Sequence, residues 1–437
     1  MSTVISKTGL WDVDVTIGLS THTKHRHVPS PVSALFQVPA PASALTFGPV
    51  ALAAAIGRTA TTRQGRPRLL AGLQKSALAQ LECLVSNEPA FALMDDFIDL
   101  ADVERTLFAA RCGAGITELY MNALGYVWRA NAACLTSTLR PHADFLYSGG
   151  NVEGLGVVLA EAHGSFAANA TAKAVAVEAK RKYARQVKPY VNKGSPFGQV
   201  VHGYSVAFGS QPGTTGAFLS VAETLVPKPR KKPPSPSAEH AVRSGGVSTP
   251  MALATHRSNF ILMGLMQVVD WIDGVARTGP LPPDAGPVAF VRLPYAGRWY
   301  LGSAFSIWPA LLARWWHDGL WDDPVWRLHI VRDVISRGFL GESVGWFVME
   351  ETACRAFLND LTGMIRSGGE NLPERLVLPS FEPVGFGTGE GSLGRRADGE
   401  EFYNYALFRD GLALLGDPFR PRKLETRRWL PKEGFEH

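Results

Sequence analysis

The sequence has few cysteines, and their spacing suits neither a metal site nor a disulfide framework. Only Cys83, Cys112, Cys134 and Cys354 occur among 437 residues, and no two of them form a CxxC pair. Structural zinc sites group their ligands in that way, and disulfide frameworks belong to shorter chains that are denser in cysteine. We therefore expect reduced thiols, mostly buried, in a cytoplasmic protein.

Long hydrophobic runs are also missing. The longest candidate extends from Phe260 to Ile272 and is interrupted by Gln267 and Asp270, so it is too short to span a bilayer. The first residues, MSTVISKTGLWDVDV, include acids and lack the apolar core of a signal peptide. The sequence predicts a soluble protein with no membrane partner.

Charge of one sign is not in large excess. Lysine and arginine number 44 against 39 acids, a net charge of +5, which only weakly indicates a polyanionic partner. Hydrophobic residues make up 46% of the chain, enough for sizeable folded cores. A length of 437 residues leads us to expect two or three domains.

Composition divides the chain into four regions. We predict an N-terminal extension over 1–100 with a helical segment at 68–84, an α/β core over 101–225, a linker over 226–250, and a C-terminal domain over 251–437. The first sixty residues, rich in Pro, Ser, Thr and Ala, favour an irregular or partly extended lead-in. The linker carries six prolines and a basic run. The C-terminal domain is Trp-rich, and we expect it to be mainly helical with a terminal β-hairpin over 400–417.

Within 101–225 the predicted order of elements is helices, strands, a long helix and further strands. Helices are expected from residue 102 and over 116–124, where Gly125 stops the second. A long Ala-rich helix is expected over 167–191. The predicted strands cover 126–130, 144–147, 156–162, 199–209 and 217–224. This order is typical of a mixed α/β sheet flanked by helices.

Two of these strands bring together residues suited to metal-assisted phosphodiester hydrolysis. Asp144 opens one strand, and Glu161 and His163 lie two apart on the next, so period-two alternation places both on one face. Magnesium prefers oxygen ligands and often uses one or two carboxylates, and a nearby cation stabilises charge that develops on the phosphate.

This arrangement, DFLY followed by GVVLAEAHGS and a long helix, resembles the PD-(D/E)XK (restriction-endonuclease-like) nuclease superfamily over residues 116–225. The resemblance implies a restriction-endonuclease-like fold and metal-dependent cleavage of nucleic acid, with DNA expected. It implies Mg²⁺ or Mn²⁺ held by Asp144, Glu161 and the carbonyl of Ala162. Glu118, on the preceding helix, corresponds to a further acidic ligand. Bacterial defence or a mobile element is the context that such cores imply.

His163 stands where the superfamily usually has a lysine. Histidine is shorter and titrates near neutrality, so it could act as a base, or it could mark a site that has lost catalysis. The alternative function is therefore a degenerate nuclease-like module that binds nucleic acid or acts as a scaffold subunit.

The long helix is strongly basic. A basic helix beside the site would suit contacts with the phosphates of nucleic acid, although a solvated surface helix has the same composition. The candidates for nucleic-acid binding are Lys180, Arg181, Lys182, Arg185 and Lys188.

Other motifs favour structural interpretations. His22, His25 and His27 fit a basic tail better than a metal site. Gly389, Gly391 and Gly394 form GxGxxG without a preceding strand. His202 and Glu223 are interpreted as structural, with Glu223 able to face the site. Tryptophans, among them Trp299, Trp308, Trp315, Trp316, Trp321 and Trp326, could stack on bases, form a partner or self-association interface, or fill a core.

Overall fold

The computed structural model describes the chain outside residues 1–13, 28–37, 61–79, 82–83, 87, 89, 136–139, 150–155, 226–245, 277–280, 284–285, 304–345, 370–371, 389–396, 399–400, 403–404, 416–423 and 437. Some predictions fall outside the described residues. These are most of the helix at 68–84, most of the linker, the GxGxxG glycines, and the tryptophans at 308, 315, 316, 321 and 326.

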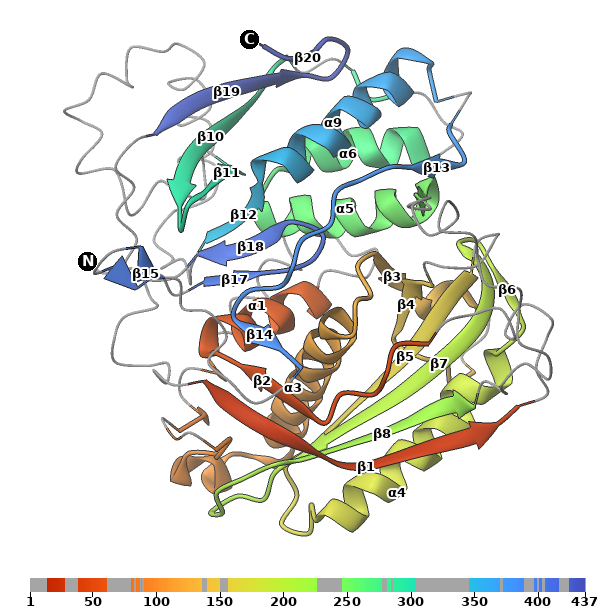
Figure 1. Ribbon diagram of the computed structural model, residues 1–437, viewed down its shortest axis with the longest axis vertical. Coiled ribbons are helices and arrows are strands. Elements are labelled where there is room, and N and C mark those ends of the chain that lie inside the picture. Colours follow the sequence, from red (N-terminus) through yellow and green to blue (C-terminus); the bar gives the residue numbers. More distant parts are fainter. Residues whose placement is uncertain are drawn as a thin grey trace, which may run out of the picture.

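Among the described residues, the first half of the chain forms most of a mixed sheet of nine strands (Figure 1). The strands are β1 (Val15–Arg26), β2 (Ala44–Phe47), β3 (Arg129–Asn131), β4 (Phe145–Ser148), β5 (Gly156–Ser165), β6 (Gly194–Ser195), β7 (Gly198–Gly209), β8 (Phe218–Leu225) and β14 (Phe386–Gly387). Their order is β14-β2-β1-β8-β7-β5-β4-β3, with β6 beside β7. The β5–β7 and β1–β8 pairs are parallel. The predicted mixed α/β class is confirmed.

Strand β1 lies inside this sheet, between β2 and β8. This segment of the predicted irregular or partly extended lead-in is extended, and the prediction of a basic tail at His22, His25 and His27 was wrong. Val15 and Ile17 alternate with exposed residues and are buried, and the polar half of the strand pairs with β8. This partner lies about two hundred residues away in sequence, so local composition could not reveal it. The sheet also crosses the predicted boundary at residue 101.

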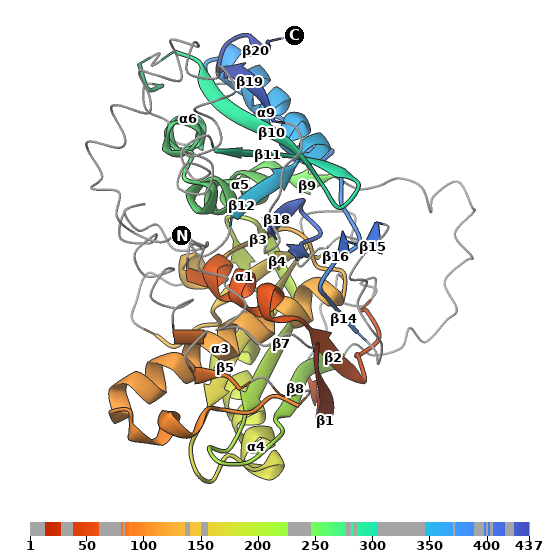
Figure 2. The ribbon, with the colours of Figure 1, turned by 90° about the vertical axis from the view of Figure 1, so that its left-hand side faces the viewer.

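Helices cover both faces of the sheet near β5 and β7 (Figure 2). On one face lies α3 (Asp102–Ala123), a single helix where two were predicted, with α1 (Pro49–Ala60) packed on it. It approaches β5 so closely that a Cβ at Gly164 would lie 1.7 Å from the carbonyl oxygen of Ala109. On the other face lies α4 (Ala172–Lys182), which continues as a π-helical turn over Tyr183–Val187.

The C-terminal part contains a second sheet, so the prediction of a mainly helical domain was wrong. Its strands are β10 (Val288–Tyr295), β11 (Arg298–Ser303), β12 (Trp346–Glu350), β17 (Tyr405–Leu407), β18 (Leu412–Leu415), β19 (Glu425–Leu430) and β20 (Gly434–Phe435). Their order is β17-β18-β12-β11-β10-β19-β20. β12 is buried at every position, and such a run has no period that distinguishes a strand from a buried helix. The β17–β18 pair confirms the predicted hairpin.

In the described part of the chain, three helices accompany the second sheet: α5 (Thr249–Met263), α6 (Met266–Ala276) and α9 (Glu351–Arg366). Gly264, at φ 76°, ends α5 in a left-handed conformation that favours glycine. The apolar run 260–272 is therefore split between two helices. None of the helices in the described ranges has the length and apolar character needed to cross a bilayer.

The remaining short strands form two small pairs. β9 (Val247–Ser248) pairs with β13 (Arg375–Leu376), and β15 (Ala397–Asp398) pairs with β16 (Glu401–Phe402). β9 leads directly into α5, so the end of the predicted linker at residue 250 lies inside ordered structure.

Candidate functional site

Asp144 and Glu161 meet at one end of the β4–β5 pair. These strands are antiparallel, and the pairing of Phe145 with Ala160 places Asp144 opposite Glu161. The backbone N–H of Asp144 donates to the carbonyl of Ala160 at 3.2 Å. The N–H of Ala162 donates to Asp144 Oδ2 at 3.0 Å. Because side chains opposite one another on paired strands share a face, the two carboxyl groups lie together.

Glu161 occupies an electrostatically unfavourable position. Its side chain is 1% exposed. Burial and the nearby charge of Asp144 raise the pKa of Glu161 to about 8, although Lys182 and Gln186 oppose the rise. Its Oε1 accepts a hydrogen bond, but its buried Oε2 has no hydrogen-bond partner among the residues that the structure describes. An unsatisfied buried carboxylate oxygen beside a second carboxyl group fits a bound cation.

Lys182 and Gln186 approach the carboxyl pair from α4 and its π-helical turn. The ammonium of Lys182 donates to Glu161 Oε1 at 3.1 Å and to Gln186 Oε1 at 3.2 Å. Gln186 Nε2 in turn donates to the carbonyl of His142 at 3.2 Å. The hydroxyl of Tyr190 donates to the carbonyl of Pro141 at 3.0 Å. The helix therefore holds the segment that leads into Asp144.

His163 lies on the same face of β5 as Glu161, as the sequence predicted. Its ring is partly buried. Burial, and after it the charge of Lys182, lower its pKa, and Glu178 only partly opposes this. His163 is therefore neutral at pH 7. This position does not carry the permanent charge that a lysine would supply.

The predicted nucleic-acid-binding residues of the helix do not all face solvent. Lys180, Arg181, Arg185 and Lys188 are exposed, and Arg181 pairs with Glu178 at 2.7 Å. Lys182 is turned inward to Glu161 instead, and its side chain is 25% exposed. The exposed four remain available to a polyanion, whereas Lys182 is part of the site.

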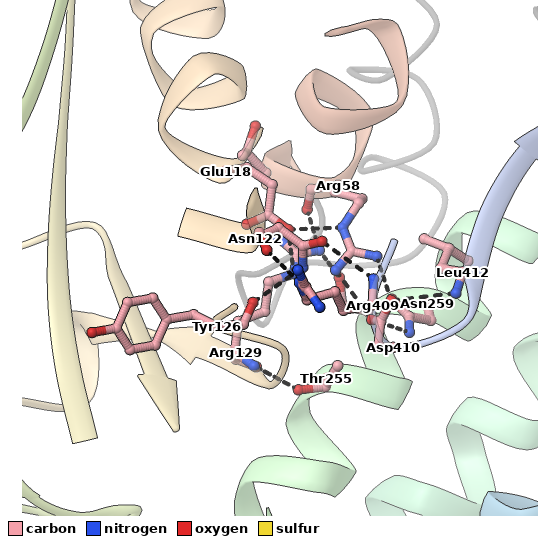
Figure 3. A network of polar contacts seen from close by, with 12 residues as sticks. Arg58, Glu118, Asn122, Tyr126, Arg129, Thr255, Asn259, Arg409, Asp410 and Leu412 are labelled. Atoms are coloured by element: carbon pink, nitrogen blue, oxygen red, sulfur yellow. Dashed lines mark hydrogen bonds and ion pairs between the residues drawn. The ribbon is translucent and has the colours of Figure 1, made fainter. Parts of the chain in front are cut away.

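Glu118 lies in a buried ion network (Figure 3). Arg58 Nε donates to Glu118 Oε1 at 2.9 Å, and the hydroxyl of Tyr147 donates to Oε2 at 2.6 Å. The other end of the Arg58 guanidinium donates two hydrogen bonds of 3.1 Å to Asp410. Asn259 donates to the same carboxylate at 2.9 Å. Both oxygens of Glu118 are thus engaged, so we do not include Glu118 among the metal ligands.

The same network joins the two halves of the chain. Arg129 Nη2 donates to the carbonyl of Arg58 at 3.0 Å and to Ser258 Oγ at 3.2 Å. Its backbone N–H donates to Thr255 Oγ1 at 2.8 Å (Figure 3). Although burial favours the neutral acid, Arg58 and Asn259 hold the pKa of Asp410 below its usual range. Nothing in the local sequence around Arg58 or Asp410 indicated this pairing.

His202 and Glu223, predicted to be structural, lie on the sheet face opposite α4. His22 Nε2 and Lys24 Nζ are 3.1 Å and 3.2 Å from Glu223 Oε1, so the carboxylate joins β1 to β8. His202 Nε2 is 3.6 Å from Oε2 of the same carboxylate. Glu223 therefore does not contribute to the Asp144–Glu161 site.

Of the aromatic residues considered for base stacking, Trp299 is described. Its ring lies 3.7 Å from the guanidinium of Arg292. The Arg298 guanidinium lies 5.7 Å from the ring of Phe381. Both contacts are internal to the C-terminal part of the chain.

The side chains of the site determine which metal ion they can hold. Across the described ranges, no group of three or more His, Cys, Asp or Glu side chains is arranged to hold a metal ion. Asp144 and Glu161 provide two carboxylates, and magnesium sites commonly complete their coordination with water and substrate oxygens. The pair therefore fits a hard divalent ion and does not fit a closed structural zinc site.

Comparisons of the chain with models of protein families, with curated proteins and with solved structures found no match. The function is therefore argued from the residues and their geometry.

Proposed function

We propose that the chain is a metal-dependent nuclease that hydrolyses phosphodiester bonds of nucleic acid, with DNA as the expected substrate. The observation that carries this proposal is the meeting of Asp144 and Glu161 at one end of β4 and β5, where no described residue forms a hydrogen bond with the buried Oε2 of Glu161. A buried carboxyl group with a half-buried one beside it favours a bound cation, and phosphodiester hydrolysis commonly uses a divalent ion.

Asp144, Glu161 and the carbonyl of Ala162 would hold Mg²⁺ or Mn²⁺. When bound, the ion would polarise the phosphate and supply hydroxide near neutral pH. The N–H of Ala162 fixes the Asp144 carboxylate, and the Lys182–Gln186–His142 chain fixes the helix against it. Exposed Lys180, Arg185 and Lys188 would contact the phosphates of a nucleic acid in the cytoplasm.

The order of elements supports a restriction-endonuclease-like core. Helix α3 precedes a three-stranded meander, β3, β4 and β5, and α4 then connects β5 to its parallel neighbour β7. The carboxyl groups lie in this meander, and the basic helix follows it. These are the relative positions that the resemblance implies.

The test is cleavage of DNA and of RNA by the purified full chain with Mg²⁺, with Mn²⁺ and with EDTA. We expect cleavage with either ion, none with EDTA, and loss of activity in Asp144→Ala and Glu161→Ala. Asp102→Ala is the control, because Asp102 is a carboxylate on α3 with 93% of its side chain exposed, and it pairs with Arg105 outside the site. Cleavage that survives both alanine substitutions would refute the proposal.

Absence of cleavage under every condition would favour the alternative, a nuclease-like module that binds nucleic acid or assembles a complex. This alternative is favoured by the histidine at position 163, where the superfamily usually has a lysine, because burial lowers the pKa of His163. Binding of uncleaved DNA, reduced when exposed lysines of α4 are replaced, would then identify the first of these roles.

A further inference from the structure

We infer that Lys182, on helix α4, supplies the cation of the carboxylate site in place of a basic residue at position 163. This inference rests on the proposed nuclease function and adds to it a residue from a different element. Lys182 would thus act on the reacting phosphate and would not belong to the outer nucleic-acid surface of the helix.

The contacts of Lys182 distinguish it from every other basic residue of α4. Its ammonium lies 3.1 Å from Glu161 Oε1 and 3.2 Å from Gln186 Oε1. Lys180, by contrast, is exposed, and its charge lowers the pKa of His25 of β1, on the other flank of the helix. A lysine held by two hydrogen bonds, one of them to the buried carboxyl group of Glu161, is directed at the site.

The alternative donor at position 163 makes no such contact. Within the described part of the chain, no hydrogen bond or ion pair joins His163 to Asp144 or Glu161. Histidine is also shorter than lysine and is not a permanent cation. The β4–β5 pair therefore contributes the carboxylates of Asp144 and Glu161, and the positive charge beside them comes from Lys182 of α4.

The geometry of the helix explains why position 182 can take this role. Helix α4 runs antiparallel to β5, and Glu178, Lys182 and Gln186 are spaced four residues apart on the flank that faces the strand. The charge of Glu178 raises the pKa of His163, and the ammonium of Lys182 donates to Glu161. Gln186 Nε2 donates to the carbonyl of His142, two residues before Asp144. Each turn of the helix thus meets one position of the site.

The cation can assist the reaction without any additional group. It would lie beside the scissile phosphate and donate hydrogen bonds to a non-bridging oxygen, whose negative charge increases in the transition state. The Lys182 proton stays on nitrogen throughout. Its loss should therefore lower the rate of cleavage more than the affinity for nucleic acid.

The experiment compares single-turnover cleavage and nucleic-acid binding for Lys182→Met, Lys180→Met and the double variant His163→Lys/Lys182→Met. We expect Lys182→Met to cleave about 100-fold more slowly while binding changes little, and Lys180→Met to stay within about twofold of the unmodified protein. The double variant should recover about tenfold of the loss, because it returns a lysine to the strand beside Glu161. Thermal denaturation of each variant verifies folding, and Lys182→Arg provides a variant that keeps the charge.

The outcomes separate the two proposals. If the unmodified protein cleaves no nucleic acid with any ion, the proposed function fails and this inference with it. If the unmodified protein cleaves and Lys182→Met cleaves equally fast, only the assignment of Lys182 is overturned. If Lys182→Met is folded, loses binding and cleavage rate in equal proportion and shows no recovery in the double variant, then Lys182 only binds nucleic acid, like the exposed basic residues of the helix.

Discussion

Replacing Glu161 with Gln should stabilise the metal-free protein, and the gain should increase with pH. Burial and Asp144 raise the pKa of Glu161 from its ordinary value of 4.5 to about 8. When folding raises the pKa of a group, its contribution to the free energy of unfolding is fully present below the pKa of the unfolded state. This contribution is lost as the pH rises through the pKa of the folded state. The protein therefore loses stability from about pH 4.5 to above about pH 8, and a neutral amide at this position does not.

The magnitude follows from the same pKa. One pKa unit corresponds to about 1.4 kcal/mol, so full ionisation of Glu161 disfavours the fold by about 5 kcal/mol. At about pH 6 the accumulated loss is about 2 kcal/mol. The attraction of Lys182 is already contained in this value, because it opposes the rise. The variant should exceed the unmodified protein by about 2 kcal/mol at pH 6 and by close to about 5 kcal/mol at pH 9.

Urea denaturation with EDTA at these two pH values measures the difference. Glu178→Gln is the control, because Glu178 is partly exposed, with 29% of its side chain accessible, and pairs with Arg181 on the helix surface. A stability difference between Glu161→Gln and the unmodified protein that is the same at both pH values would refute the argument that Glu161 ionises inside the fold.

Three further outcomes are expected. Asp410→Ala should destabilise the protein by about 3–5 kcal/mol in chemical denaturation, because it leaves Arg58 buried without one of its carboxylates. The control is Glu382→Ala, which removes a carboxylate that is 85% exposed and pairs with Arg409. It should change stability by less than about 0.5 kcal/mol, and equal effects of the two substitutions would contradict the role of the network. Gly164→Ala should lower the melting temperature, because its Cβ would collide with a carbonyl of α3 at 1.7 Å, and an unchanged melting temperature would mean that α3 packs elsewhere. Addition of Mg²⁺ should raise the melting temperature of the unmodified protein and leave that of Glu161→Gln unchanged, and an equal rise in both would exclude Glu161 as a ligand.

The positions of Asp144 and Glu161 were predictable because local rules determine them. Asp144 directly precedes β4, Glu161 lies on its neighbour β5, and strand periodicity sets the face on which each side chain lies. The same rules placed His163 beside Glu161. The long helix after β5 was predicted as well, although it ends in a π-helical turn that periodicity does not reveal.

The parts that could not be predicted depend on contacts between distant residues. The role of Lys182 depends on how α4 is rotated against β5, and in sequence it is one of several lysines and arginines. β1 is ordered by pairing with β8, and Arg58 by a carboxylate 352 residues further along the chain. The second sheet was missed because buried strands such as β12 have no alternation.

The Arg58–Asp410 pair sets an order of events for a chain that emerges from the ribosome. The nine-stranded sheet cannot close its buried charge network, or receive β14 on β2, until residues beyond 380 have been synthesised. Until then Arg58 has Glu118 as a partner and lacks Asp410, so the early chain is held short of its final packing. Cutting the gene at the proline-rich linker would therefore yield an N-terminal fragment in which Arg58 lacks the Asp410 carboxylate, and co-expression of the C-terminal part should increase the solubility of this fragment.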